Sequence, residues 1–369
     1  MVRKVEASLN STIDRTQLLF LIIKTQIGIG LLSLPAEIQS SAKSDSWISV
    51  LVAGTVIQFI LLVYWLLLRK FPNDNLSAIT VRMLGPYIGR AINAVYYAFF
   101  VFIAAYASTL YVELVKNWML PLTPGWILLL LIIGTSLYLA YDNLRVIARF
   151  FVLSSALFIV LIMISILTFS NNVHVSNIMP IGQTGVLQIL NGSEKTFFSM
   201  LGFEVTLFYF SQVQGNRKGM FKVISLANLF VTLFYTYFVF ICLIGFSPDA
   251  LGHMNEPVLY ILKGLSYQLF DRIDLIFLTI WIIPMTVTIV SYLCVAGKSL
   301  TTSQSAYQKL VLFSGAAVFA IGWYLSKLES LEPFNKWLEK AYFIMIAAVP
   351  LLLWLGSFLT TAGAKAEST

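Results

Sequence analysis

The stretch that decides the fold is LIIKTQIGIGLLSLP, residues 21–35. It is apolar enough to lie in a membrane, but Gly28 and Gly30 interrupt it near its middle, beside the polar Thr25. A break in a membrane helix frees backbone N–H and C=O groups, which are tolerated only where they face protein, a cavity or a ligand. Glycine also serves as a close-packing residue in membrane helices. Because the pattern recurs later in the chain, we interpret Gly28-Ile29-Gly30 as a break.

The recurrence is SMLGFEVTLFYFS, residues 199–211. Gly202 and Glu204 stand near the middle of this apolar segment, and 174 residues separate Gly28 from Gly202. The same offset carries Trp47, at the start of the next apolar run, to Phe221. Paired interruptions in corresponding helices are typical of transporter folds built from inverted repeats, with a binding site at mid-membrane.

Composition supports a membrane protein throughout the chain. Of the 369 residues, 59% are hydrophobic and 11% charged, whereas soluble domains carry about 25% charged residues. This excludes a soluble enzyme and a nucleic-acid partner. About 20 apolar residues span a bilayer, and ten segments qualify: 17–39, 47–68, 91–115, 122–140, 146–169, 186–210, 221–246, 272–296, 309–326 and 340–360.

These segments predict an all-α integral membrane protein with ten transmembrane helices and a single domain over residues 1–369. Five plus five helices form two repeats, about 17–169 and 186–360, and because five is odd the repeats are inverted. The first and sixth helices are broken. The loops on the side of the N-terminus hold about twice as many Lys and Arg residues as the opposite loops, which places both termini in the cytoplasm.

Several residues near the breaks are candidates to line a ligand site. The third and eighth segments are expected to form its walls, and the eighth contains Pro284, which must release a carbonyl. A helix N-terminus after Gly30 would face a carboxylate, and carbonyls near residues 201–203 would accept an ammonium group. The candidate ligand-binding residues are Thr25, Gly28, Ile29, Gly30, Tyr97, Leu201, Gly202, Phe203 and Thr286.

Ionisable residues within a bilayer are costly and are candidates for function. Lys24 and Glu204 both fall on the cytoplasmic side of the breaks, so we expect them to form a pair or a water-linked contact. Alternatively, Lys24 extends to the inner interface, and Glu204 is protonated or capped by freed N–H groups. Glu113, near the outer end of the third segment, is either interfacial or a vestibule residue that meets a ligand amine.

Catalytic chemistry is not indicated. The sequence contains no nucleotide-binding loop, metal cluster or pairing of a nucleophile with a base, and its two histidines, His174 and His253, stand in loops far apart in sequence. We therefore expect neither an enzyme nor a cofactor or metal.

Two motifs resemble a known family. Residues 27–35, IGIGLLSLP, resemble the first-helix signature of the amino acid–polyamine–organocation superfamily. Gly202-Phe203-Glu204, the aromatic half-helix after it and the basic loop Asn216–Lys218 resemble the B subunits of GerA-type nutrient germinant receptors of spore-forming bacteria. That family has a proline soon after this helix, and Phe210-Ser211-Gln212 has none.

The resemblance implies a sensor in the spore inner membrane. It would bind a small nutrient such as an amino acid and signal through a larger A subunit and a lipoprotein C subunit. Two other functions remain open from the residues: a proton- or sodium-coupled amino acid permease, and a water or ion conduit. Uptake driven by an ion gradient would indicate the permease.

Overall fold

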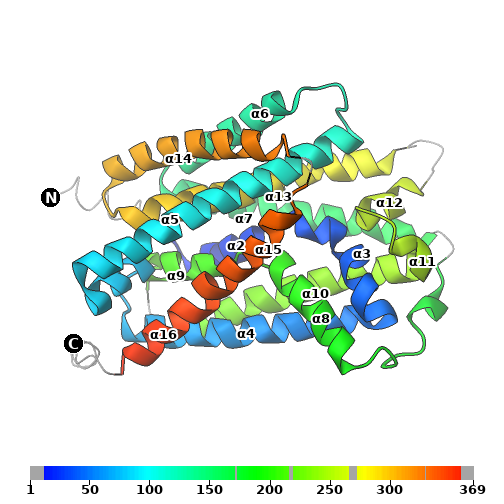
Figure 1. Ribbon diagram of the computed structural model, residues 1–369, viewed down its shortest axis with the longest axis horizontal. Coiled ribbons are helices and arrows are strands. Elements are labelled where there is room, and N and C mark those ends of the chain that lie inside the picture. The colour runs from blue at the N-terminus through cyan, green and yellow to red at the C-terminus, as the bar shows by residue number, and fades with distance from the viewer. Residues whose placement is uncertain (1–11, 171–172, 216–218, 266–271, 329, 359–369) are drawn as a thin grey trace.

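The computed structural model describes residues 12–358, apart from 171–172, 216–218, 266–271 and 329. The basic loop Asn216–Lys218 and the last two residues of the segment 340–360 lie outside this set. The described chain is built from helices and loops (Figure 1). Its α-helices are α2 (Arg15–Gln26), α3 (Gly30–Ala42), α4 (Ser46–Lys70), α5 (Leu76–Trp118), α6 (Gly125–Ala140), α7 (Leu144–Ile166), α8 (Val186–Ser199), α9 (Thr206–Tyr209), α10 (Met220–Gly245), α11 (Pro248–Leu251), α12 (Pro257–Lys263), α13 (Ile273–Leu300), α14 (Gln304–Leu325), α15 (Glu332–Tyr342) and α16 (Val349–Gly356).

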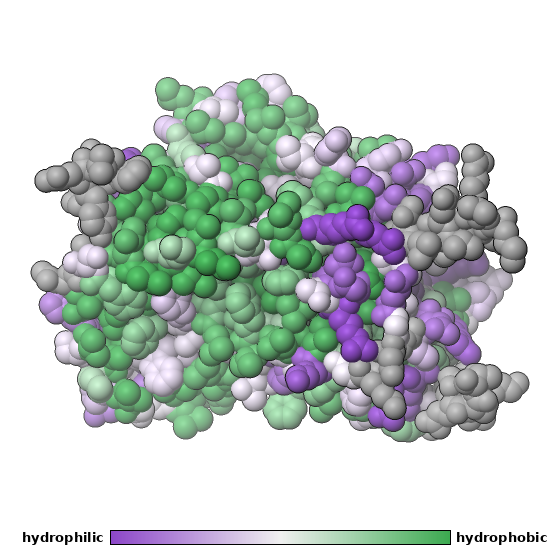
Figure 2. Space-filling view, turned by 180° about the vertical axis from the view of Figure 1, so that it is seen from behind, coloured by the Kyte–Doolittle hydropathy of each residue, from purple (hydrophilic) through white to green (hydrophobic). Residues whose placement is uncertain are grey.

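Seven helical stretches of the described chain are long and apolar enough to cross a membrane. They are Gly30–Lys70, Leu76–Trp118, Leu144–Ser170, Met220–Gly245, Ile273–Leu300, Gln304–Leu325 and Pro333–Gly356. Large apolar side chains such as Phe59 and Leu153 are exposed on their surfaces. Figure 2 shows hydrophobic residues covering most of one face, with hydrophilic residues gathered toward one end. Because no water-soluble surface would expose so much apolar area, the molecule is a multi-pass membrane protein.

The helices pack in two groups around α2. In Figure 1, α5, α13 and α14 run side by side in the upper part, and α4 and α10 run side by side in the lower part, where α8 crosses and contacts α4. Between the groups, α2 contacts α7, α10 and α13, and all its residues from Leu21 to Gln26 are buried. The polar residues of α2 are therefore held inside the protein.

Two helical stretches are interrupted at the glycines. The first, α2, ends at Gln26, and α3 begins at Gly30 without a side-chain cap. The second, α8, ends at Ser199, and helical structure resumes as a 3-10 turn at Phe203–Val205 before α9. Between them, Gly202 has φ +126°, a conformation open to glycine but strained for other residues.

The helix around the predicted segment 91–115 is longer than expected. It starts at Leu76, where the side chain of Asn75 accepts the N–H of Ala78, and it bends at Gly85, where φ is +82°. Residues 76–90 lie between the predicted spans 47–68 and 91–115 and carry Arg82 and Arg90. Side-chain capping and the bond from Thr80 Oγ1 to Asn93 Oδ1, at 2.8 Å, explain why they are helical.

Candidate functional site

A cavity of about 510 Å³ opens beside the two interruptions. The first interruption contributes Gln26, Gly28, Ile29 and Gly30 to its lining, and the second contributes Ser199 and Leu201. Helix α5 lines another side with Ile103, Tyr106 and Glu113, and α13 with Met285, Thr288 and Tyr292. The mouth is polar and is formed by Glu37, Asn117, Lys195, Glu256, Asn335 and Glu339. The volume suits a small-molecule ligand.

One tyrosine joins the two interruptions. The Tyr235 hydroxyl on α10 lies 3.0 Å from the Gln26 carbonyl oxygen and 2.8 Å from the Ser199 carbonyl oxygen, and its single hydrogen is shared between these two helix ends. The same hydroxyl accepts the N–H of Gly28. It thus satisfies backbone groups that would otherwise be unpaired in the membrane interior. Because only proximity in space reveals this role, sequence reasoning missed Tyr235.

Gly202 lies directly against the end of α2. A Cβ atom at this position would stand 2.5 Å from the Thr25 carbonyl oxygen, so glycine is required by contact as well as by its positive φ. At Gly28 a Cβ would meet only the Thr288 side chain, at 3.8 Å. The two glycines therefore have different roles: Gly202 permits the approach of two backbones, and Gly28 leaves space on the cavity side.

Glu204 is buried and capped. Its carboxylate accepts the N–H of Gly202 at 2.8 Å and the Tyr292 hydroxyl at 3.1 Å. Since Tyr292 lines the cavity, the carboxylate stands one side chain behind the cavity wall. Capping by freed backbone N–H groups was one of the alternatives left open by the sequence.

Lys24 and Glu204 do not form the direct pair that was one form of the predicted contact. Lys24 is fully buried, and its Nζ donates to the Ser154 carbonyl oxygen of α7 at 2.8 Å and lies 4.0 Å from the centre of the Phe158 ring. Lys24 therefore faces α7, while Glu204 faces α13. Position in the sequence indicates the depth of both residues in the membrane, but not the rotation of α2 about its axis.

The remaining candidates divide between the cavity and its surroundings. Thr25 is a lining residue, and its Oγ1 lies 2.7 Å from Ser291 Oγ of α13. Tyr97 and Thr286 are not among the lining residues: Tyr97 accepts from Ser314 of α14, and Thr286 donates to the carbonyl of its own helix at Ile282. Helix α13 does form a wall, with its Met285, Thr288 and Tyr292 face. The backbone of Gly202 and the side chain of Phe203 lie behind the lining, where both residues are buried.

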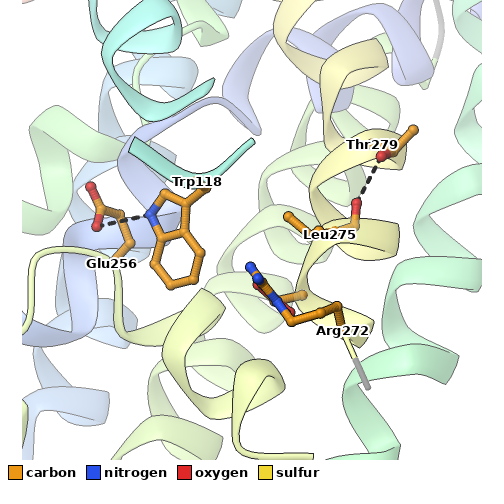
Figure 3. Close-up of polar contacts among 6 residues, drawn as sticks. Trp118, Glu256, Arg272, Leu275 and Thr279 are labelled. Carbon is orange, nitrogen blue, oxygen red and sulfur yellow. Dashed lines mark hydrogen bonds and ion pairs between the residues drawn. The ribbon is translucent and has the colours of Figure 1, made fainter. Parts of the chain in front are cut away.

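The mouth of the cavity carries its own polar contacts. Figure 3 shows the Trp118 indole donating to the carboxylate of the lining residue Glu256, at 3.4 Å. Arg272 and the bond from Thr279 to Leu275, also drawn there, belong to the first turns of α13 outside the lining. Burial raises the pKa of Glu256, and the bond from Trp118 partly offsets this. Glu113 is exposed at the mouth, which is the vestibule position considered for it. Tyr106 donates to Asn335 across the opening.

The geometry defines a helical membrane protein of a transporter fold, with a cavity built at two helix interruptions. Solved transporters share this fold. MhsT in complex with L-phenylalanine superposes with a TM-score of 0.64 at 15% identity, covering 97% of this chain and 92% of that chain. A substrate-bound, outward-open Na⁺-coupled sialic acid symporter gives a TM-score of 0.63 at 12% identity, covering 91% and 78%.

The family model for spore germination proteins (Spore_permease) matches residues 12–330, and the chain belongs to this family. Germination protein GerQB of Bacillus cereus is 26% identical over 340 residues, 91% of this chain and 93% of the relative. Germination protein A2 of Bacillus subtilis (strain 168) is 23% identical over 339 residues, 90% and 92% of the two chains. These matches confirm the resemblance to germinant receptor B subunits.

Proposed function

We propose that this chain is the ligand-binding membrane subunit of a spore nutrient germinant receptor, and that its ligand is a small nutrient such as an amino acid. The single observation that carries the proposal is the cavity that opens at the two helix interruptions. Its lining combines backbone with apolar and hydroxyl side chains, which suits a small polar molecule. The L-phenylalanine bound by MhsT, whose fold is similar, supports an amino acid ligand.

The proposed architecture has ten spans in two inverted repeats. Helices α2–α3, α4, α5, α6 and α7 form the first repeat, and α8–α9, α10, α13, α14 and α15–α16 the second. Both termini lie in the cytoplasm, and the mouth of the cavity faces the opposite side of the spore inner membrane. The placement of one interruption at the start of each repeat supports this arrangement.

Ligand binding is proposed to shift the equilibrium between conformers of the interrupted helices. A carboxylate would lie at the start of α3, near the positive end of the helix dipole. The Gly202–Glu204–Tyr292 contacts lie between the cavity and the helix segment that follows, so a ligand against Tyr292 would act on them. Differential affinity for the two conformers is the source of the shift, which would pass to an A subunit and a C lipoprotein.

The experiment is equilibrium binding of labelled amino acids to the purified chain in nanodiscs, with uptake measured in parallel in proteoliposomes. A receptor binds one ligand saturably without accumulating it. Gly28→Ala is the informative variant, because the added methyl group meets only Thr288 and narrows the cavity without a backbone clash. We expect weaker binding with an unchanged melting temperature. The absence of saturable binding of any labelled amino acid to the wild-type chain would contradict the proposal.

The second candidate is an ion-coupled amino acid permease. The observation that favours it is the fold shared with a Na⁺-coupled symporter. Accumulation driven by a proton or sodium gradient in the same proteoliposomes would establish this function in place of a pure receptor.

A further inference from the structure

Two segments that are distant in sequence pair at the end of the helix bundle opposite α11 and α12, where α9 lies (Figure 1). We call this the inner end. The N–H of Ile13 donates to the Gln212 carbonyl oxygen at 3.0 Å, and the N–H of Gln214 donates to the Ile13 carbonyl oxygen at 2.9 Å. These bonds form a parallel β-bridge at the buried Ile13. Residues 12–14 and 212–214 are called the inner latch below.

Each half of the inner latch ends a segment that reaches the cavity. Helix α2 follows the first half and ends at Gln26, a lining residue. The chain from Leu201, another lining residue, leads through α9 to the second half. The segments are also joined at the cavity, since Gln26 Nε2 donates to the Met200 carbonyl oxygen at 3.1 Å. Because residues 12–26 and 200–214 are joined at both ends, we expect them to move as one body, called the paired limbs.

Basic side chains attach the inner latch to the surrounding helices. On α7, the Arg145 guanidinium donates to the carbonyl oxygen and to Oγ1 of Thr12, both at 3.3 Å. On α13, the Lys298 ammonium donates to Gln212 Oε1 at 2.9 Å. The acceptor in each of these bonds is a neutral oxygen. Breaking such a bond leaves no acidic charge uncompensated, in contrast to breaking a buried ion pair, so the latch can open at a modest cost in free energy.

The packing between the cavity and the inner latch makes α2 a lever. Leu18 and Ile22 of α2 and Leu207 of α9 are fully buried, so the paired limbs fill the bundle on the inner side of the cavity. Helix α2 has 12 residues and is therefore about 18 Å long. A tilt of α2 at its cavity end is for this reason converted into a displacement of the latch.

The attached limbs also cover a thiol. Cys294 on α13 is fully buried, and the hydroxyls of Tyr209 and Tyr307 form hydrogen bonds with it. Tyr209 belongs to α9 in the paired limbs, and Lys298, one turn along α13 from the thiol, lies 5.4 Å from the centre of its ring. Movement of the paired limbs away from α13 would remove Tyr209 and expose Cys294.

From this pairing and its attachments, we propose that the inner latch is a conformational switch. It holds the inner end closed while the mouth of the cavity is open, and it releases the paired limbs when α2 tilts at the interruption that follows Gln26. Arg145 and Lys298 set the balance between the held and the released state. The inference goes beyond the proposed function, because it concerns the opposite end of the molecule and does not depend on the identity of the ligand.

The test uses the two native cysteines and needs no ligand. The purified full-length chain in nanodiscs is treated with N-ethylmaleimide, and modification of Cys242 and Cys294 is followed separately by peptide mass spectrometry. Both thiols are buried, but Cys242 lies on α10, outside the paired limbs. Opening of the inner latch therefore exposes Cys294 alone, whereas global unfolding exposes both.

Removing one attachment should open the latch more often. In Arg145→Leu we expect Cys294 to react at least about tenfold faster than in the wild-type chain, because hydrogen bonds from a charged group are lost. Cys242 should keep its slow reaction. The matched control is Arg149→Leu, an exposed arginine one turn further along α7, which should leave both rates unchanged.

A disulfide across the latch should have the opposite effect. Neighbouring strands lie about 4.8 Å apart, within the Cα separation that a disulfide spans. In Ile13→Cys/Val213→Cys, oxidation by copper–phenanthroline should join the two introduced cysteines. The oxidised protein should then modify Cys294 at least about tenfold more slowly than the reduced protein, and reduction should restore the rate.

The second attachment is tested in the same way. Lys298→Met should also speed the modification of Cys294, and Lys309→Met, an exposed lysine on α14, is its control. Because Lys298 is close to the thiol, the same variant closed by the disulfide serves as the reference. Its Cys294 should again react slowly, which separates opening of the latch from a direct effect of the substitution on the thiol.

The outcomes distinguish the latch from the proposed function. An unchanged rate for Cys294 in Arg145→Leu, or equal rates with and without the disulfide, would overturn the latch while leaving a ligand-binding receptor in place. If Arg145→Leu exposes both thiols, the variant is unfolded, and the disulfide comparison in the otherwise wild-type chain decides. Failure of every amino acid to bind would overturn the proposed function and leave these measurements of the latch unaffected.

Discussion

At the scale of the residue, the two central glycines have different roles: Gly202 allows two backbones to pack closely, and Gly28 leaves space in the cavity. Gly202 has a positive φ and lies against the Thr25 carbonyl, whereas a Cβ atom at Gly28 would meet only the Thr288 side chain, at 3.8 Å. In the sequence they look equivalent, because each stands near the middle of an apolar segment. Their difference arises from the neighbours that the fold brings to them.

Gly202→Ala is therefore expected to destabilise the protein, by about 1–3 kcal/mol from backbone strain alone and further from the contact with Thr25. Gly28→Ala should be close to neutral for stability. Thermal unfolding of both variants in detergent measures the difference. Equal melting temperatures for the two would contradict the role given to Gly202.

Tyr235 is the other residue with a specific structural task. Tyr235→Phe leaves the carbonyls of Gln26 and Ser199 without this donor, and we expect a loss of about 1–3 kcal/mol together with weaker ligand binding. The matched control is Tyr237→Phe on the same helix, whose hydroxyl contacts Ser165 Oγ at 2.9 Å away from the interruptions. The control should keep its ligand affinity; a parallel loss of affinity in both variants would refute the assignment.

At the scale of the element, α2 is held by different partners on different faces. Lys24 bonds to α7, Thr25 contacts Ser291 of α13, and Gln26 bonds to the end of α8. Three consecutive side chains therefore point to three neighbours, since successive residues on a helix are about 100° apart. This explains why Lys24 and Glu204 are not partners although both lie near the interruptions.

The absence of coupling between these two residues can be measured. In a double-mutant cycle of Lys24→Met and Glu204→Gln, the effects on stability should add within about 0.3–0.5 kcal/mol, as for residues without a shared partner. Chemical unfolding of the four proteins gives the values. A coupling energy well above this limit would show that the Lys24 and Glu204 side chains interact, which would contradict the contacts described here.

At the scale of the whole molecule, the cavity opens on one side of the helix bundle. Cys242 and Cys294 are both buried, so a cysteine introduced into the cavity can be labelled against a low background. Ser33→Cys, at a partly buried lining position, should react with a membrane-impermeant thiol reagent added on the side opposite the termini. Saturating ligand should slow the reaction.

Ser108→Cys, at a fully buried position on α5, is the control and should stay unreactive. Labelling of Ser33→Cys from the side of the termini alone would contradict the proposed orientation.

The sequence alone determined the all-helical membrane architecture, the family, and the two positions at which helices are interrupted. These properties follow from local patterns: apolar runs of spanning length, and glycines within them. Glu113 at the mouth and Thr25 and Leu201 on the lining could also be found in this way. The extension of α5 to Leu76 could not, because its first turns are too polar to appear as a span.

The tertiary structure alone decided which face each helix turns toward the cavity. On the same two helices, the cavity is lined by Tyr106 and Thr288 rather than by the predicted Tyr97 and Thr286. The structure also shows that Lys24 and Glu204 point to different neighbours. It identifies two features absent from the sequence analysis, the Tyr235 contacts and the pairing of Ile13 with Val213. The physical reason is that a nearly uniform apolar helix carries little information on its own rotation. That rotation is set by contacts with residues distant in sequence, which exist only once the helices have packed.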